Sequence, residues 1–341
     1  MATLGNSVVT LLDQAKRFGP DHKIAKICEM LAQTNEILLD MPFKEGNLPT
    51  GERITQRTSL PAVYWRKYNE GIAPSKSTTA QFDVQCAMLE SYSEVDKDLA
   101  ELNGDVANFR ISEASAYLEA MNQEWAQTLF YGSQANPEEF VGFAEMYNST
   151  SDNNGQNILL AGGAGADNSS VYLVGWGDNS AYSIYPKGSQ AGLYHEDIGL
   201  VTVETTAGIA GNRMRAYQDH WQIKTGLVVK DWRYVSRIAN IDISDLKATT
   251  STQATTASTF LIDLMDQAVA RMPSLAGITP VFYANRTVMA ALRTAARKTS
   301  SSVLSVEQGL NQFGQSIFEL RFMGIPVRMV DQLTTTESLI S

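Results

Sequence analysis

The chain has 341 residues, of which 44% are hydrophobic, and this is enough for one large or two small domains with a substantial core. Only 19% of the residues are charged and the formal net charge is -10, which argues against a protein that grips nucleic acid mainly through a basic face. No segment approaches the roughly 20 apolar residues that span a bilayer. The first residues lack the charged start and apolar run of a secretory signal. These totals predict a chain that folds in a cytosol.

Residues 1–45 are predicted to form an arm rather than a domain. Apolar spacing predicts short helices over Val8–Phe18 and Lys23–Leu39. Two helices this short cannot bury their apolar stripes against each other alone, so we expect them to lie on the rest of the chain or on another chain. Cys28 in the second helix and Cys86 in an alternating strand are expected to be buried free thiols rather than a disulfide framework.

Residues 46–97 are predicted to be an extended hairpin. Strand-type composition covers Arg53–Thr58, Val63–Tyr68 and Thr79–Val84, with turn residues before the last of these. Because an isolated two-stranded ribbon is marginal in water, its stability must come from a neighbour. The hairpin is locally basic inside an acidic protein, which fits either an ordinary solvated surface or a contact with an acidic neighbouring subunit. The residues expected to make such a contact are Arg53, Arg57, Trp65, Arg66 and Lys67.

A long helix is predicted over residues 109–131, within a segment that spans residues 98–150. At about 1.5 Å per residue it is roughly 30 Å long. Gly132 and Pro137 end it, and Glu113 is expected away from its apolar face. We expect this helix to be a spine between the arm and a globular body. The residues on its predicted face are Ala114, Tyr117, Leu118, Met121, Trp125, Thr128 and Leu129.

Residues 151–317 are predicted to form a mixed body, in which the first part is rich in Gly, Asn, Ser and Asp and reads as short antiparallel strands. Loops are expected at Thr249–Ser258 and Thr299–Val306. Helices are expected at Phe260–Met272 and Asn285–Arg297, the latter capped by Asn285. The predicted strands cover 157–160, 170–176, 181–185, 199–204, 220–229, 233–243 and 280–284. A closing strand pair at 318–322 and 325–330 precedes a tail that ends at residue 341.

The histidines do not form a recognisable site. There are three, His22, His195 and His220. His195 has no second His or Cys at metal-binding spacing, so it is interpreted as a surface residue. His220 is interpreted as a hydrogen-bonded structural residue at the start of a strand.

No other motif carries recognisable chemistry. The glycine-rich run at 161–167 lacks the third glycine and the following helix of a phosphate-binding loop, so a turn is predicted. The acidic pairs Asp242 with Asp245 and Glu196 with Asp197 are too common to assign acid–base roles. We predict no catalytic residues, no cofactor and no metal, and therefore not an enzyme.

The order of arm, hairpin, long helix, β-rich body and closing strand pair resembles the major capsid proteins of tailed bacteriophages, which have the Hong Kong 97-type fold. The phrases IKTGLVVKDWRYVSRIANID at 223–242 and FMGIPVRMVDQL at 322–333 resemble this family as well. The resemblance implies an α+β fold with an N-arm at 1–45 and an E-loop at 46–97. It also implies a P-domain with the spine helix at 98–150, an A-domain at 151–317 and a closing segment at 318–341.

The resemblance implies a structural subunit that assembles as hexamers and pentamers into an icosahedral shell around a double-stranded DNA phage genome. The E-loop would lie over the adjacent subunit, and the acidic balance fits a shell that encloses DNA without sequence-specific binding. Implied partners are further copies of the chain, a scaffolding protein, a portal and a cement protein, with no membrane. The location would be the virion, after assembly in the host cytoplasm.

The sequence leaves three alternatives to weigh. Some family members form Lys–Asn cross-links, for which Lys67 or Lys76 would be the donor, but no motif supports this and we expect non-covalent interlocking. An encapsulin-like shell around cargo enzymes is the alternative function. An ordinary enzyme with an unrecognised site is a third possibility, and the lack of His, Cys and glycine-loop constellations weighs against it.

Overall fold

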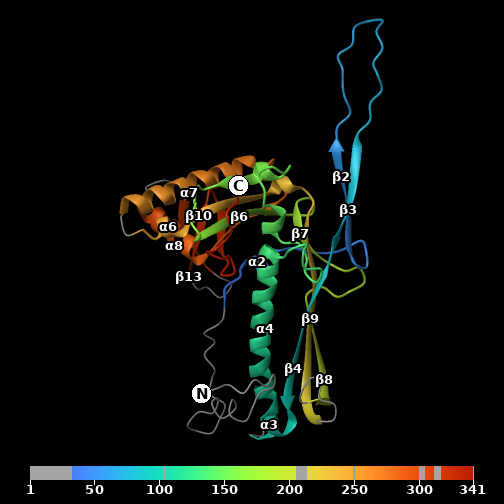
Figure 1. The fold of residues 1–341 in the computed structure, drawn as a ribbon, viewed down its shortest axis with the longest axis vertical. Coiled ribbons are helices and arrows are strands. Elements are labelled where there is room, and N and C mark those ends of the chain that lie inside the picture. Colours follow the sequence, from blue (N-terminus) through green and yellow to red (C-terminus); the bar gives the residue numbers. More distant parts are fainter. Residues whose placement is uncertain are drawn as a thin grey trace.

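An α/β body, a long helix beside a β ribbon, and a projecting hairpin make up the fold in the computed structural model (Figure 1). It describes residues 33–102, 105–204, 213–248, 251–298, 304–310 and 316–340. The described helices are α2 (Ile37–Asp40), α3 (Lys97–Glu101), α4 (Val106–Tyr131), α5 (Phe143–Met146), α6 (Ile243–Leu246), α7 (Ser251–Arg271) and α8 (Arg286–Lys298). The described part has no helix long and apolar enough to cross a membrane.

The strands are numbered in the order in which they occur along the chain, and most of them belong to one large sheet. They are β1 (Phe43–Glu45), β2 (Gly51–Ser59), β3 (Thr78–Gln85), β4 (Ala87–Asp96), β5 (Ile158–Leu160), β6 (Asn168–Trp176), β7 (Ala181–Tyr185), β8 (Leu193–Glu204), β9 (Arg213–Val229), β10 (Val235–Asp242), β11 (Thr279–Ala284), β12 (Leu304–Leu310), β13 (Ser316–Phe322) and β14 (Ile325–Met329).

Strand β6 is the centre of the body because both of its faces are covered. All of its residues are buried, as in strands that have packed layers on both sides. Alternate side chains therefore enter two different cores. Val171 and Leu173 pack with residues of α7 and α8. Tyr172 and Val174 pack on the opposite face with the end of α4 and with α5.

The body sheet is mixed rather than antiparallel. Its main path runs β12, β13, β14, β11, β6, β7, β9, β4. Strand β11 is antiparallel to β6 and parallel to β14, and β7 is parallel to both β6 and β1. The predicted antiparallel pairing is confirmed for β7 and β8, which both pair with β9, whereas β5 with β10 and β6 with β7 pair parallel. The short strands themselves lie within one to two residues of their predicted starts, except for β8 and β9, which begin earlier.

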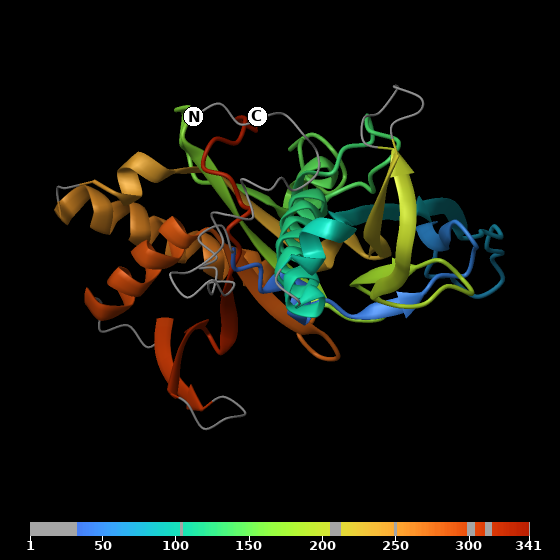
Figure 2. The same cartoon turned by 90° about the horizontal axis from the view of Figure 1, so that it is seen from below.

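A β ribbon runs out of the body along the long helix. One end of β9 pairs with β7 in the body, and the rest pairs antiparallel with β4 and β8. The predicted strand 220–229 covered only the later part of β9. The earlier part consists mostly of polar residues, so it lacks the apolar spacing that indicates a strand. Viewed along α4, the orange and red body and the yellow ribbon lie on opposite sides of the helix (Figure 2).

The spine helix α4 matches its predicted range and begins three residues earlier, at Val106. Its first turn is capped by Asp105, whose carboxylate accepts a hydrogen bond from the Asn108 backbone N–H at 3.2 Å. The predicted buried face was partly wrong, because Leu118 is exposed and Glu113 is buried. The reason is that the helix changes neighbours along its length. Its first half packs on the ribbon and its last turns enter the body core.

The hairpin consists of β2 and β3, which pair antiparallel from Gly51 with Gln85 to Ser59 with Thr78. One prediction about this region was wrong, because the segment Val63–Tyr68 is not a strand but part of the connection between β2 and β3. Strand β4, which follows the hairpin, pairs with β9 in the ribbon.

Three further predictions need correction within the described part. In the predicted helix Lys23–Leu39, residues 33–36 are not helical, and α2 begins only at Ile37. The predicted loop Thr249–Ser258 is mostly helix, since α7 begins at Ser251 and packs on α6 and α8, which overrides the weak helix propensity of Thr. The end of the predicted loop Thr299–Val306 belongs to β12. The other predictions at Val8–Phe18, His22 and Cys28 lie outside the described residues.

Asn285 caps α8 as predicted, and it also ties α8 to the closing segment. Its Oδ1 accepts a hydrogen bond from the Thr287 backbone N–H at 2.9 Å, and its Nδ2 donates to the Leu333 carbonyl. We expect Asn285→Ala to lower the free energy of unfolding by about 1–2 kcal/mol, measured by urea denaturation. Asn285→Ser keeps a cap acceptor and should lose less, whereas equal midpoints for Ala and wild type would contradict the cap.

Candidate assembly interface

The connection between β2 and β3, residues 60–77, is here named the tip loop. Every residue from Arg57 to Asp83 is exposed, so the outer hairpin has no core of its own. Large exposed apolar surfaces on soluble proteins mark interaction sites. The large apolar side chains exposed on the tip loop are Leu60, Val63, Tyr64, Trp65, Tyr68 and Ile72, with Trp65 completely exposed.

Few contacts hold the tip loop in shape. The Ser75 hydroxyl donates to the Ala62 carbonyl at 2.7 Å, and Arg66 reaches the Glu70 carbonyl at 3.4 Å. Asn69 adopts the left-handed backbone region, with φ 63°, in the turn that reverses the chain. The tip loop is therefore held by a handful of polar contacts and buries none of its aromatic residues.

The five predicted contact residues lie on this hairpin but differ in their surroundings. Arg53 forms a two-pronged ion pair with Asp83 across the hairpin, at 2.7 Å for both nitrogen–oxygen distances, and this hydrogen bonding lowers the pKa of the Asp83 carboxyl. Arg57, Arg66 and Lys67 pair with no carboxylate among the described residues. The consecutive residues Trp65, Arg66 and Lys67 thus lie side by side on the tip loop, and Arg66 and Lys67 have no acidic partner among the described residues.

Arg57 lines a groove at the base of the hairpin. The groove has a volume of about 610 Å³ and lies between β2 and the turn that contains Lys230 and Arg233. Lys230 donates to the Asn179 side chain at 3.1 Å, and Arg233 pairs with Asp231 at 2.7 Å. The groove is therefore basic, like the tip loop.

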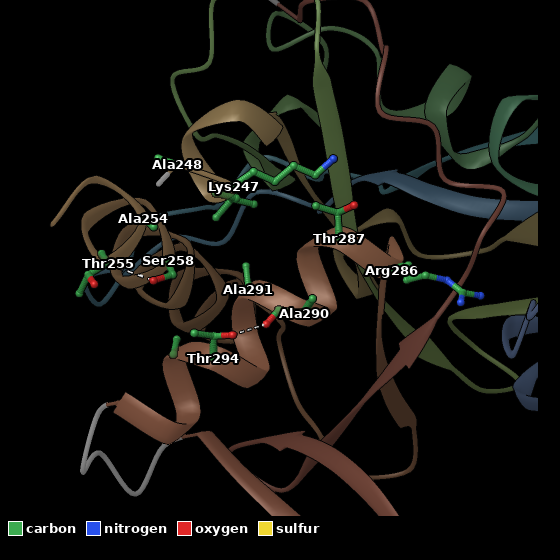
Figure 3. A pocket seen from close by; sticks show the side chains of 12 residues that line it. Lys247, Ala248, Ala254, Thr255, Ser258, Arg286, Thr287, Ala290, Ala291 and Thr294 are labelled. Carbon is green, nitrogen blue, oxygen red and sulfur yellow. Dashed lines mark hydrogen bonds between the residues drawn. The ribbon is translucent and has the colours of Figure 1, made fainter. Parts of the chain in front are cut away.

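A second cavity, of about 480 Å³, lies between α7 and α8, and most of its polar lining groups are paired within the chain (Figure 3). Its floor consists of alanine and threonine side chains. The Thr294 hydroxyl donates to the Ala290 carbonyl of its own helix at 2.9 Å, and Ser258 likewise donates to the Thr255 carbonyl at 3.1 Å. Arg286 at the rim is paired with Asp331. Small-molecule sites need convergent polar groups, and these polar groups are already satisfied.

The glycine-rich run at 161–167 is a loop between β5 and β6, as predicted, and not a phosphate cradle. The backbone N–H of Gly163 donates to the Asn240 carbonyl at 2.8 Å, and a Cβ on Gly163 would approach that oxygen to 2.6 Å. Nearby, Asp242 caps α6 by accepting from the Asp245 backbone N–H at 3.1 Å. The glycines therefore permit close backbone packing, and the acidic pair has a capping role.

The histidines on the ribbon stack on aromatic rings. His195 stacks on Trp221 with 4.0 Å between ring centroids and lies 3.1 Å from Asp219. His220 stacks on Tyr92 at 4.5 Å, and its buried Nε2 hydrogen-bonds to no described group. The interpretation of His220 as hydrogen-bonded at the start of a strand was wrong, because it lies within β9. The described residues contain no cluster of three or more His, Cys, Asp or Glu side chains placed to bind a metal.

Sequence reasoning missed the ion pairs that join the helix to the ribbon. Arg110 of α4 contacts Asp197 at 2.5 Å and Asp219 at 2.8 Å. Its hydrogen bond is the main cause that lowers the pKa of the Asp197 carboxyl. No spacing signal could have found this contact, because the three residues lie on different elements.

The comparisons with known proteins agree with this arrangement. The family model described as major capsid protein GP7 matches residues 19–341. A chain in the cryo-EM structure of bacteriophage Epsilon15 is 30% identical, with 99% of each chain covered and a TM-score of 0.77. No curated protein matches this chain.

Two more distant structures give only weak likenesses. The bacteriophage JBD30 capsid is 10% identical and covers 90% of this chain and 93% of its own, with a TM-score of 0.46. The holo-SrpI encapsulin complex from Synechococcus elongatus is 10% identical and covers 68% of this chain and 96% of its own, with a TM-score of 0.41. The family match and the 30% identical Epsilon15 chain favour a phage capsid protein over the encapsulin alternative.

The hairpin, spine helix and α/β body, taken with these matches, define a structural protein of a phage capsid with the Hong Kong 97-type fold. The chain belongs to the major capsid protein GP7 family. It is thus a component of the virion shell, built from copies of itself, and not an enzyme.

Proposed function

We propose that the chain assembles as hexamers and pentamers into an icosahedral shell that encloses a double-stranded DNA phage genome. The exposed tip loop supports this proposal, because its large apolar side chains are exposed, its cationic side chains have no acidic partner within the described chain, and both fit a contact with a neighbouring subunit. The overall acidity, with a net charge of -10, suits an inner surface that holds DNA without binding its phosphates tightly.

The proposed division of the chain has an arm at 1–45, a hairpin segment at 46–97, a spine segment at 98–150, a body at 151–317 and a closing segment at 318–341. The interlocking between subunits is proposed to be non-covalent. A scaffolding protein, a portal and a cement protein are the proposed partners besides the chain itself, and assembly is placed in the host cytoplasm.

The test of the function is assembly of the purified chain, expressed alone and with any co-encoded scaffold. Sedimentation and negative-stain microscopy should find closed shells or hexamer-sized capsomers. A stable monomer under all conditions would contradict the proposal. Enclosed nucleic acid would distinguish a genome shell from a compartment that holds enzymes.

Two substitutions on the hairpin should block assembly without unfolding the subunit. Trp65→Ala removes a large exposed ring, and Arg57→Glu reverses a charge that has no partner in the described chain. We expect soluble subunits with wild-type circular dichroism and at least about a tenfold drop in assembled particles, since loss of a central aromatic or Arg typically costs 2 kcal/mol or more. Trp65→Phe and Arg57→Lys are the matched controls. Normal shells from both disruptive variants would exclude these contacts.

A further inference from the structure

We propose that the tip loop of one copy docks, through Trp65, Arg66 and Lys67, into an acidic pocket beside α4 of a neighbouring copy. This inference rests on the proposed function and adds a specific receptor for the hairpin. The acidic pocket is a cavity of about 180 Å³ lined by Ala87, Met88, Leu89, Glu124, Trp125, Thr128, Glu138, Glu139, Phe140 and Thr225.

The floor of the acidic pocket is apolar and aromatic. Leu89 comes from β4, Trp125 from α4, and Phe140 from the turn that follows α4. The Trp125 indole N–H is buried and donates to no acceptor among the described residues. Buried donors are usually paired, so this indole N–H is a polar group at the pocket that the described chain leaves unsatisfied.

The rim of the acidic pocket is negative. Glu124 and Glu138 are exposed and Glu139 is half-buried. None of these three carboxylates has a cationic partner in the described part of the chain, and Glu139 is held only by the Asn136 side chain at 3.2 Å. On the tip loop, the cations Arg66 and Lys67 lie beside the Trp65 ring. They complement the three carboxylates around the apolar floor of the acidic pocket. The charge pattern therefore selects the tip loop over the acidic surfaces of the same protein.

The size of the pocket also restricts the occupant. Its volume of about 180 Å³ is near six times the roughly 30 Å³ that one water occupies in the liquid. One ring system fits such a space, whereas a helix does not. Trp and Arg are the residues most often found at the energetic centre of protein interfaces. The fully exposed Trp65, flanked by Arg66, meets this description.

The occupant must come from a second copy. In Figure 1 the hairpin projects away from the body at one end of the molecule, while α4 and β4 run toward the opposite end. The tip loop of a chain thus points away from its own acidic pocket. A ring of copies lets each tip loop reach the next subunit, as a heterologous, head-to-tail contact requires.

Reciprocal charge reversal tests the contact in the full-length protein. The tip reversal is Arg66→Glu with Lys67→Glu, and the pocket reversal is Glu138→Lys with Glu139→Lys. Each reversal alone should lower the yield of shells or capsomers at least about tenfold, because like charges then face each other. Both reversals in one chain should restore assembly. The matched control combines the tip reversal with Asp263→Lys and Asp266→Lys, which reverse two exposed charges on α7 and should restore nothing.

The outcomes separate the docking site from the function. If wild type assembles and the double reversal stays as defective as the tip reversal alone, or the α7 control restores equally well, the acidic pocket is not the receptor although the capsid function stands. If wild type forms neither shells nor capsomers, the proposed function fails first. An independent readout keeps Trp65 and uses Tyr64→Cys, at an exposed position beside it, with Thr128→Cys in a chain carrying Cys28→Ser and Cys86→Ser. Oxidised particles should give a ladder of covalent oligomers on a non-reducing gel, and monomer alone would overturn the proposal.

Discussion

Arg237→Leu is expected to lower the free energy of unfolding by about 3–5 kcal/mol, because it leaves a buried carboxylate without its cation. Arg237 and Glu337 are both buried, and their side chains meet at 2.7 Å. The guanidinium also donates to the Ser170 hydroxyl at 3.0 Å and to the Tyr147 carbonyl at 2.9 Å. One side chain thus joins β10, β6, the end of α5 and the closing segment.

Glu337 connects the same network to the spine helix. Its second carboxylate oxygen accepts from the Tyr131 hydroxyl at 2.5 Å, and the Tyr131 oxygen accepts from the Thr334 backbone N–H at 3.0 Å. Burial, aided by the charge of Glu337, raises the pKa of Tyr131, so this hydroxyl remains a donor at every physiological pH. The closing segment is therefore fastened to the last turn of α4 as well as to the body sheet.

The prediction is checked by urea denaturation of four variants. Arg237→Leu and Glu337→Leu should each lower the midpoint strongly, because each leaves one buried charge alone. Together they should recover most of the loss, since replacing both members of a buried pair by apolar residues is often nearly neutral. The urea midpoint of Arg237→Lys should lie between those of wild type and Arg237→Leu. An ammonium keeps the charge but cannot make all the contacts of the guanidinium. A loss below about 1 kcal/mol for Arg237→Leu would show that the network does not stabilise the fold.

The features that sequence could predict are those that repeat at a regular spacing. The uninterrupted stretch before Gly132 predicted the end of α4 to the residue and its start within three residues, and Asn285 correctly marked the start of α8. The features that failed depend on tertiary neighbours. The Thr-rich start of α7 has weak helix propensity and is helical because it packs on other helices. The tip-loop segment Val63–Tyr68 has strand-type residues but no strand beside it to pair with.

The candidate interface was likewise only partly predictable from the sequence. The cluster of Trp65, Arg66 and Lys67 is contiguous, so composition alone was enough to predict it as a contact, and the contact stays a prediction. The acidic pocket is assembled from β4, α4, the turn after α4, and β9, which are far apart in the chain. No periodicity joins such segments. The pairing of Arg237 with Glu337 was invisible for the same reason, because the two residues are separated by 100 positions.

Replacing the tip loop by a two-residue Asn-Gly turn is expected to abolish assembly while leaving the fold intact. Ser59 and Thr78 face each other at the end of the paired strands, so a short hairpin turn can join them directly. The tip loop buries no large side chain, so its removal costs little packing. A shorter loop also has a smaller entropic cost of closure. The free energy of unfolding should therefore stay within about 1 kcal/mol of wild type or rise slightly.

Shells and capsomers should be absent for this variant by sedimentation and microscopy, because it lacks the Trp65 ring and the two cations that we propose reach the neighbouring copy. A matched variant that replaces residues 60–77 with a Gly/Ser loop of equal length separates side-chain contacts from loop length. It should fail in the same way, since a flexible linker keeps the reach but supplies no anchor. Normal shells from the Asn-Gly variant would mean that copies hold together through other surfaces, such as the basic groove at Arg57. The exposed aromatic residues of the tip loop would then need a partner other than a second copy of this chain.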